Sequence, residues 1–241
     1  MTPQAHRYSG VPAAFLRCVA LAHDPDDPED PKETEAMALI FRQATADDQA
    51  AIEAITTDGR AFLASQGLDQ WQGGNPTPEC IAQDIAQGND YLAVDEETGE
   101  RLGVVAVCAG GEADYDNVRA GAWLTESVNA VPFEGAEGTR DAGSAGGADP
   151  AGQPGFPTYL TLHRIAVSAA ARGRGVASFM LRESIAIARE RGFKSVRVDT
   201  HAGNLPMQGA FLKHGFVRCC DIEITNPIEP NKDRIGFELV L

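Results

Sequence analysis

The sequence predicts a single α/β domain in which helices cover a mixed β-sheet. From residue 38 onward, short segments rich in β-branched residues alternate with amphipathic segments, and turn residues separate them. The chain has 241 residues, 43% of them hydrophobic and 23% charged, which is typical of a globular protein long enough to bury a core.

The first half of this pattern begins with a strand over 38–43. Thr45 then stands as a candidate N-cap, with acidic residues in the first turn of the helix that follows. We expect a short helix and a loop over 57–76, and a further helix capped by Thr77. The runs "DYLAVDE" and "RLGVVAVCAG", separated by a turn, predict a hairpin.

The second half resumes with a strand over 158–167. A helix follows, with an apolar face that includes Val176 and Met180, and it ends at Gly192. The next elements are a strand in "SVRVDTH", a helix in "NLPMQGAFLKHG" and a closing pair of strands in "FVRCCDIEI" and "RIGFELVL". The expected order is therefore β-α-α-β-β-β-α-β-α-β-β.

Two segments have compositions unlike the rest. Residues 24–36 are acidic and Pro-rich with nothing to bury, so we expect residues 1–36 to form a disordered or loosely ordered extension. The domain would then span 37–241, and Met37 is an alternative start of the native product. Residues 124–157 are rich in glycine and small residues, which predicts a flexible insertion.

The net charge and the cysteines exclude several classes of function. A formal charge of −15 argues against general binding to nucleic acid or to an anionic membrane. No apolar stretch has the length of a membrane span, and Arg17 interrupts the run that most resembles a signal peptide. The five cysteines lack metal-site spacing, so we expect no metal, reduced thiols and a cytoplasmic protein. Cys219 and Cys220 should point to opposite faces of a strand.

The turn in "RIAVSAAARGRGVASFMLRES" has the chemistry of a phosphate site. A glycine-rich turn that leads into a helix exposes the first N–H groups of that helix, where the dipole adds partial positive charge. Gly173 and Gly175 permit close approach of the backbone, and Arg172 and Arg174 can add charge-assisted contacts. A solvated glycine-rich turn is the alternative for these residues taken alone.

The spacing narrows the choice of phosphate ligand. The chain has no G-x-x-x-x-G-K-[ST] run, and Ser178 stands where a dinucleotide fingerprint needs its third glycine. What remains is R-x-x-G-x-A, formed by Arg172, Gly175 and Ala177. With the flanking runs "LHRIAV" and "VRVDTHAGNLPMQGAFLKHGF", this motif resembles the GNAT superfamily of acyl-CoA-dependent N-acetyltransferases. The resemblance covers about 38–241 without the insertion and is strongest over 162–216.

The resemblance implies a GNAT-like fold, with a mixed, mostly antiparallel central sheet flanked by helices in one domain, and acetyl-CoA (coenzyme A) as cofactor. Backbone N–H groups over 172–177 would hold the pyrophosphate, the strand end over 165–167 would run along the pantetheine arm, and Asn204 would contact that arm. The implied cofactor-binding residues are Ile165, Ala166, Val167, Arg172, Gly173, Arg174, Gly175, Val176, Ala177, Asn204 and Phe211.

The implied reaction moves an acetyl group from the CoA thioester to a primary amine by direct attack in a ternary complex. His163 is the first candidate for the base, because an alternating strand puts Thr161, His163, Ile165 and Val167 on one face. A histidine packed in the structure is the alternative of equal weight. Glu112 is a second catalytic candidate, with a solvated polar loop as its alternative. A backbone N–H near Val167 is the expected oxyanion donor.

The proton donor to the leaving thiolate is left open. Phe211 stands where many family members carry a tyrosine, so Tyr159, Tyr115 or water would take that role, or the thiolate leaves unassisted. Trp71, Gln70 and Tyr115 are the expected substrate-binding residues for a small-molecule or peptide amine. The family often dimerises, so a homodimer is an open expectation. A non-catalytic acyl-CoA-binding or regulatory module is the alternative function, and a nicotinamide-dependent oxidoreductase is disfavoured by the missing glycine.

Overall fold

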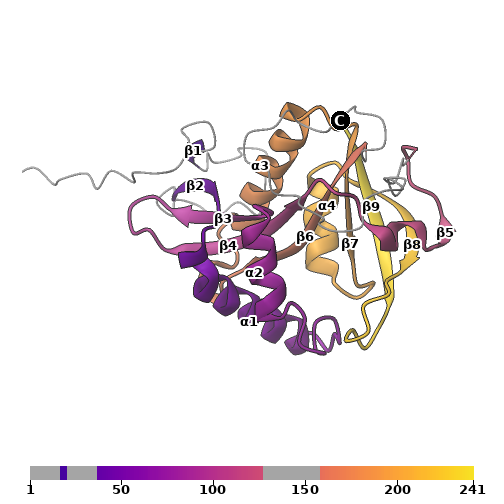
Figure 1. The fold of residues 1–241 in the computed structure, drawn as a ribbon, viewed down its shortest axis with the longest axis horizontal. Helices are drawn as coiled ribbons and strands as arrows, with labels where there is room; N and C mark the ends of the chain where they lie inside the picture. Colours follow the sequence, from indigo (N-terminus) through magenta and orange to yellow (C-terminus); the bar gives the residue numbers. More distant parts are fainter. Residues whose placement is uncertain (1–16, 21–36, 127–157) are drawn as a thin grey trace, which may run out of the picture.

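The computed structural model describes residues 17–20, 37–126 and 158–241 (Figure 1). The strands in these ranges are β1 (Arg17–Ala20), β2 (Ala38–Gln43), β3 (Asp90–Asp95), β4 (Arg101–Cys108), β5 (Val118–Gly121), β6 (Tyr159–Val167), β7 (Ser195–Thr200), β8 (Val217–Glu223) and β9 (Asp233–Val240). The α-helices are α1 (Gln49–Ser65), α2 (Pro78–Ala86), α3 (Val176–Glu190) and α4 (Leu205–Lys213).

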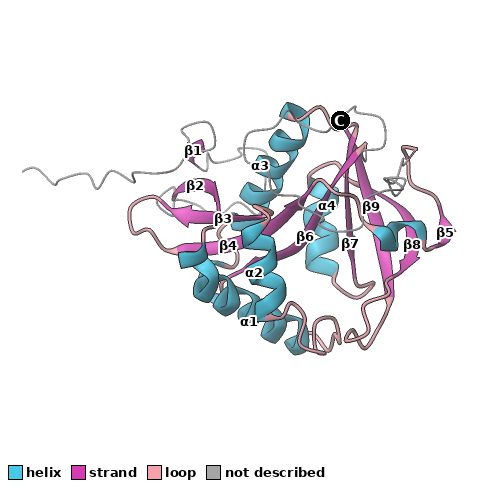
Figure 2. Ribbon diagram, in the orientation of Figure 1, coloured by secondary structure: helices cyan, strands magenta, loops and turns pink. Residues whose placement is uncertain are grey.

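The strands form one sheet in the order β1-β2-β3-β4-β6-β7-β9-β8-β5. Only β6 and β7 run parallel among these neighbours, and every other neighbouring pair is antiparallel. Helices flank this sheet (Figure 2). The prediction of a single α/β domain with a mixed, mostly antiparallel sheet is therefore confirmed.

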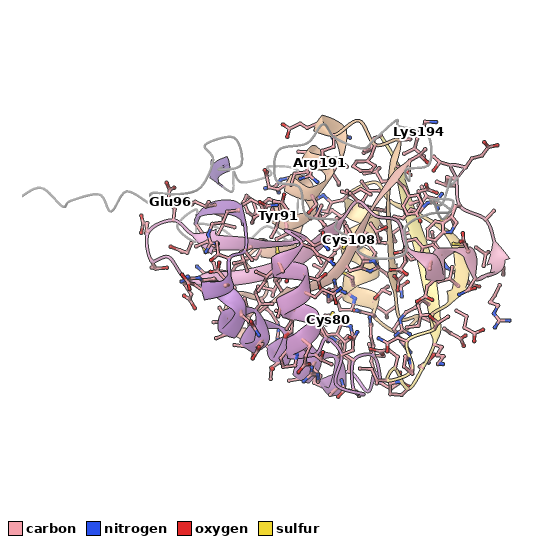
Figure 3. All side chains as sticks on the ribbon, viewed as in Figure 1. Cys80, Tyr91, Glu96, Cys108, Arg191 and Lys194 are labelled. Atoms are coloured by element: carbon pink, nitrogen blue, oxygen red, sulfur yellow. The ribbon has the colours of Figure 1, made fainter. Side chains whose placement is uncertain are left out.

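Alternate residues of the central strands bury themselves against different helices. Ala93 and Val105 share a core cluster with residues of α3, whereas Leu92 and Val104 share one with residues of α1. Because successive side chains of a strand point to opposite faces, α1 and α3 cover opposite faces of the sheet. Arg191, after the end of α3, also donates a hydrogen bond to the Tyr91 hydroxyl on β3 at 3.1 Å (Figure 3).

The junction of β2 and α1 is held by a buried carboxylate. Asp48 is 1% exposed and accepts hydrogen bonds from Arg42, Arg101 and the Thr45 N–H, each at 2.8–2.9 Å. Burial raises the pKa of this carboxyl, but the bonds from Arg42, Thr45 and Arg101 outweigh burial and hold the pKa well below its ordinary value. Thr45 and Asp48 form the capping box that the sequence indicates through Thr45.

Helix α1 differs from the prediction, because it runs without a break through the region expected to hold a separate short helix. Gly59 lies inside it, and a Cβ there would lie 3.1 Å from Cζ3 of Trp71. The glycine is therefore explained by the close approach of the indole and does not mark a helix end.

The sheet opens between its two parallel strands. β6 and β7 pair only over three residues each, Tyr159–Thr161 with Ser195–Arg197. Beyond them β6 continues against β4, and β7 continues against β9. The facing edges of the residues that follow, 162–167 and 198–200, are thus left without strand partners in the described sheet.

Two strands lie outside the predicted order. β1 pairs antiparallel with β2, so residues 17–20 join the sheet although they fall in the segment expected to lie outside the domain. β5 pairs with β8 at the other edge. The remainder of 1–36 and most of the expected insertion, 127–157, lie outside the described residues, so the expected domain boundaries remain a prediction. Among the described helices, none has the length and apolarity needed to cross a membrane.

The expectation that Cys219 and Cys220 point to opposite faces of their strand is wrong. The register of β8 against β9 shifts between Arg218 and Cys220, which is the signature of a β-bulge. The bulge interrupts the alternation of side chains, and the Sγ atoms of Cys219 and Cys220 lie 3.9 Å apart. Both thiols are free, as are those of Cys80 and Cys108.

Candidate active site

A cavity of about 550 Å³ lies where β6 and β7 separate. Residues 162–167 of β6 line one side of it, and Asp199 and Thr200 of β7 line another. It also brings together most of the side chains that the sequence singles out: Gln70, Trp71, Glu112, Tyr115, His163, Ile165, Ala166, Val167, Arg172, Gly173, Gly175, Val176, Ala177, Asn204 and Phe211. Arg174 and Tyr159 are not among the lining residues.

The glycine turn has the backbone geometry of an anion site. Gly173 and Gly175 have φ values of +75° and +78°, and Gly175 is the N-cap of α3. A Cβ on Gly173 would meet no atom within 4 Å, so the turn is open on that side and no described side chain fills it. The left-handed backbone is what requires glycine there. Val176 and Ala177, at the start of α3, also line the cavity, and the first N–H groups of a helix have no partner within it.

The two arginines of the turn are placed differently. Arg172 lines the cavity, lies 4.7 Å over the Phe62 ring and donates to the Asp58 carbonyl of α1. Arg174 is exposed, with its guanidinium near the Met37 sulfur, and its N–H donates to the Ala171 carbonyl at 3.3 Å. The prediction that Arg174 reaches the ligand is therefore not supported by its position, because its side chain lies outside the cavity.

His163 and Glu112 meet inside the cavity. His163 Nε2 lies 3.1 Å from Glu112 Oε2, and the histidine side chain is 19% exposed. Burial raises the pKa of Glu112, but its hydrogen bond to His163 and the charge of His163 lower the pKa below the ordinary value. Glu112 also accepts the Asp114 N–H at 3.1 Å. The pair is an imidazole oriented by a carboxylate, the arrangement of a general base.

Tyr159 holds the backbone of Glu112 in place. Its hydroxyl accepts the Glu112 N–H at 3.1 Å, and its side chain is fully buried outside the cavity lining. The position of Tyr159 outside the cavity lining therefore does not support its predicted role as the acid.

The expected common face of β6 is also wrong. Between Ala106 and Val104 of β4 the pairing moves from His163 to Ala166, so Arg164 and Ile165 form a β-bulge. Arg164 has a left-handed φ of +52°, which is uncommon for a residue other than glycine and marks the local distortion at the bulge. His163 and Ala166 consequently share the α1 side of the sheet, whereas Ile165 and Val167 pack against the cluster that contains α3.

Tyr115 donates a hydrogen bond to Asp199 at the cavity wall. The distance is 3.0 Å. Complete burial and the adjacent Asp199 carboxylate raise the pKa of Tyr115 well above its ordinary value. Burial also raises the pKa of Asp199, although the positive charges of His163 and Arg234 act in the opposite direction. The phenol therefore keeps its proton at neutral pH.

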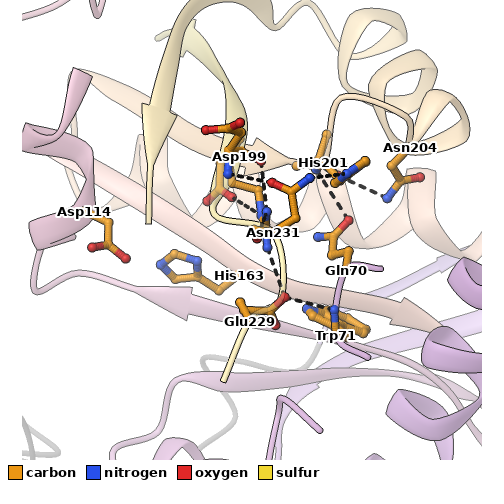
Figure 4. Close-up of polar contacts among 12 residues, drawn as sticks. Gln70, Trp71, Asp114, His163, Asp199, His201, Asn204, Glu229 and Asn231 are labelled. Carbon is orange, nitrogen blue, oxygen red and sulfur yellow. Dashed lines mark hydrogen bonds and ion pairs between the residues drawn. The ribbon is translucent and has the colours of Figure 1, made fainter. Parts of the chain in front are cut away.

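The predicted acceptor side comes from the loop before α2. Trp71 has a left-handed φ of +66°, and its N–H donates to Glu229 Oε2 at 3.1 Å (Figure 4). The Gln70 side chain accepts the His201 N–H at 3.4 Å. His201 itself contacts Asn231 at 3.2 Å and does not line the cavity, which fits a structural role.

Asn204 and Phe211 complete the side formed by α4. Asn204 is the N-cap of α4, with its carbonyl oxygen accepting the Met207 N–H at 3.4 Å and its amide donating to Thr200 at 3.1 Å. Phe211 is buried against Phe216 and Phe237. In this state the Asn204 amide is engaged within the protein, and any contact with a cofactor would add to these bonds.

Sequence reasoning missed Glu229 and Arg234. Both line the cavity, both are 4% exposed, and Arg234 Nη2 lies 3.1 Å from Glu229 Oε2. Glu229 comes from the loop between the closing strands and Arg234 from the start of β9, within "NPIEPNKDR", where an acid and a base near Pro and Asn are typical of a solvated loop. No signal in the sequence distinguishes them. In the ranges described, no group of three or more His, Cys, Asp or Glu side chains is placed to hold a metal ion.

Comparison with solved structures finds the same fold in bacterial acetyltransferases. A GNAT-family acetyltransferase from Streptococcus agalactiae aligns with a TM-score of 0.64 and 26% identity, covering 84% of this chain and 95% of that one. A GNAT-family acetyltransferase from Listeria monocytogenes shares the fold with a TM-score of 0.55 and 18% identity, over 87% of this chain and 98% of that one. A ribosomal-protein-alanine N-acetyltransferase from Brucella melitensis shares the fold with a TM-score of 0.53 and 20% identity, over 83% of this chain and 99% of that one.

Among curated proteins no match is found. The sequence profile of the Acetyltransferase (GNAT) family matches residues 68–216, which include the open strands, the glycine turn and most of the cavity wall. The chain therefore belongs to the GNAT acetyltransferase family.

Proposed function

We propose that the protein is an acetyl-CoA-dependent N-acetyltransferase that acetylates a primary amine by direct attack in a ternary complex. The observation that supports this most is that one cavity contains both the glycine turn of α3 and the His163–Glu112 pair. An anion site at one end and a general base at the other are what a transfer from a phosphate-bearing carrier to an amine requires.

The residues present fit coenzyme A. The turn over 172–177 offers backbone N–H groups and an open approach at Gly173 for a pyrophosphate. The unpaired edge of β6 over 165–167 offers main-chain groups to the amides of a pantetheine arm, as an added strand would use them. When bound, acetyl-CoA supplies the activated acetyl thioester.

The His163–Glu112 pair would accept the proton of the attacking amine. An alkylamine with a pKa of about 10.4 is neutral in only ~1 molecule in 10³ at pH 7. Removing that proton at pH 7 costs about 5 kcal/mol, and a base at this position would accept it as the amine attacks. The Glu112 carboxylate orients the ring and stabilises the imidazolium that forms.

Tyr115 is the candidate donor of a proton to the leaving thiolate, because it lines the cavity and its phenol stays protonated. Its hydroxyl now donates to Asp199 and would have to turn toward the thiolate. A thiol with a pKa of about 8.5 is also a tolerable leaving group, so water at this position would serve as well. A backbone N–H near Val167 would stabilise the oxyanion.

Thiol release by the purified protein tests the proposal. Acetyl-CoA with a panel of primary amines should release CoA only when protein and a suitable amine are both present. Tight binding of acetyl-CoA without release over a broad panel would favour a non-catalytic acyl-CoA-binding module instead. Failure of acetyl-CoA to perturb the amides over 172–177 in an NMR titration would overturn both the transferase and the acyl-CoA-binding module.

A further inference from the structure

Glu229 has one carboxylate oxygen engaged by the protein and one that is not. Oε2 accepts the Trp71 N–H and the Arg234 guanidinium, each at 3.1 Å. Oε1 is buried and has no hydrogen-bond partner within the described part of the chain. A buried acceptor without a donor costs about 1–3 kcal/mol. Glu229 lines the cavity, so a small turn of its carboxylate would bring Oε1 to an N–H group of a ligand, which would supply the missing donor.

The cation beside Glu229 is held by several oxygens of the protein. Arg234 Nη1 donates to the carbonyls of Asn231 and Asp233 at 2.7 and 2.9 Å. Its Nη2 atom is bonded to Glu229, and its Nε lies 3.8 Å from Asp199. Nη1 and Nη2 of this guanidinium thus already donate to protein oxygens, and the charge of Arg234 is balanced by Glu229 and Asp199.

Most of the other charges on this part of the wall are acidic. Glu112, Asp114, Asp199 and Glu229 all line the cavity. Arg164, which also lines it, is paired with Asp84 of α2 through Nη2, while its buried Nε has no hydrogen-bond partner in the described residues. The amine-binding side therefore offers two separate carboxylate positions to a cation, one at Glu112 with His163 and one at Glu229.

We propose that the acceptor is an amine that carries a second cationic N–H group and no carboxylate, as in an α,ω-diamine. Glu229 Oε1 binds the distant ammonium, while the near amine lies at His163. This inference depends on the proposed function, which it deepens by naming the class of acceptor. Glu229 is the residue that determines specificity, and the Trp71 N–H and Arg234 hold its carboxylate in place.

Three acceptors separate the features of this site: cadaverine, n-pentylamine, which lacks the second ammonium, and lysine, which adds a carboxylate to cadaverine. Steady-state release of CoA should give a kcat/KM for cadaverine about tenfold or more above each of the other two, the range of a charge-assisted hydrogen bond. In Glu229→Gln, the advantage over n-pentylamine should fall to about twofold or less. Glu97→Gln removes an exposed acid from the β3–β4 turn and should leave the advantage unchanged.

Equal kcat/KM values for cadaverine and n-pentylamine, or a preference for lysine, would overturn the inference. So would an equal loss for both amines in Glu229→Gln, because a purely structural role would not depend on the acceptor. If Glu229→Gln does not fold, Glu229→Asp keeps the charge beside Arg234 and should shift the preference toward 1,6-diaminohexane, since its carboxylate is one methylene shorter. An unchanged preference in Glu229→Asp would count against the inference.

Calorimetry separates failure of this inference from failure of the proposed function. Cadaverine should bind the CoA-loaded protein more tightly than n-pentylamine even if no thiol is released. Tighter binding without release would support the acceptor site and overturn the transferase reaction. Release of CoA with both amines at equal rates, together with equal affinities for both, would support the transferase reaction and overturn the acceptor site.

Discussion

Two side chains from different elements, His163 on β6 and Glu112 after β4, meet at 3.1 Å, and main-chain contacts fix the second of them. The Glu112 N–H is bonded to Tyr159, and its carboxylate to the Asp114 N–H. A base held in this way needs little rearrangement before it accepts a proton, which is how positioned acid–base groups contribute to rate.

Replacing His163 by alanine should lower kcat by about 10²-fold, because the proton of the amine then passes to bulk water. Glu112→Gln should lower kcat by about tenfold, since the ring remains but loses the carboxylate that orients it. The measurement is a kcat–pH profile with the unfolding free energy as a control. A profile that coincides with that of the unmodified protein would remove His163 from the mechanism.

A second prediction at the residue scale concerns Asp90, at the start of β3. It is 3% exposed, and burial together with the adjacent Asp84 raises its pKa to about 7, although Arg164 acts to lower it. In the unfolded chain the pKa is about 3.9, so between about pH 4 and 7 the folded state binds more protons. Stability linked to Asp90 is therefore lost as the pH rises through about 7.

Asp90→Asn should abolish that loss and be more stable than the unmodified protein at pH 8, on the order of 2 kcal/mol. At pH 4 the two proteins should differ little. Urea unfolding at both pH values measures the difference, and Glu97→Gln serves as an exposed control. Lower stability of Asp90→Asn at pH 8 would contradict the stated cause.

At the scale of elements, the turn before α3 and the bulge in β6 decide which groups reach the cavity. The turn was predictable from its glycines, because their spacing from Arg172 is compatible with few classes of phosphate ligand. The bulge was not, because an extra residue in a strand is set by the pairing with β4 and has no mark in "LTLHRIAV". The predicted alternation therefore failed at Arg164, although His163 still reached the site.

Gly173 and Gly192 offer a matched pair at the two ends of α3. Both have φ +75°, and a Cβ on either would meet no atom within 4 Å. Alanine at either position should lower the unfolding free energy by about 1 kcal/mol, the cost of a left-handed backbone. Only Gly173→Ala should also weaken CoA binding, by about tenfold, because its methyl group lies where the pyrophosphate approaches.

Thermal unfolding and equilibrium titration with CoA measure the two effects. An affinity for CoA that stays unchanged in both alanine variants would show that the turn does not contact the phosphate. Loss of affinity in Gly192→Ala as well would assign the effect to the whole helix.

At the scale of the molecule, the order of elements and their gathering around one sheet were predictable, because hydrophobic periodicity records which residues are buried. The residues on the side of the cavity proposed to bind the amine were only partly predictable. Trp71 and Tyr115 stand out as aromatic residues, whereas Glu229, in the loop between β8 and β9, and Arg234, at the start of β9, acquire their roles only when this part of the chain lies against the loop before α2. Contacts between segments so distant in the chain leave no local pattern.

The expected domain boundary is a prediction for the whole molecule. A chain that starts at Met37 should fold and keep its kcat/KM within about twofold, because β1 adds only four residues at the edge of the sheet, far from the cavity in the strand order. Circular dichroism and the thiol-release assay measure both properties. Insolubility or loss of activity would show that the segment before Met37 belongs to the domain.

The interruption between β6 and β7 has a thermodynamic consequence. A carrier that occupies it would supply the main-chain contacts that the sheet lacks there, so the ligand would take part in the cooperative unit that unfolds. The melting temperature should then climb with carrier concentration by the usual linkage relation. Amide hydrogen exchange at 165–167 should slow in parallel, turning a stability measurement into a readout of occupancy.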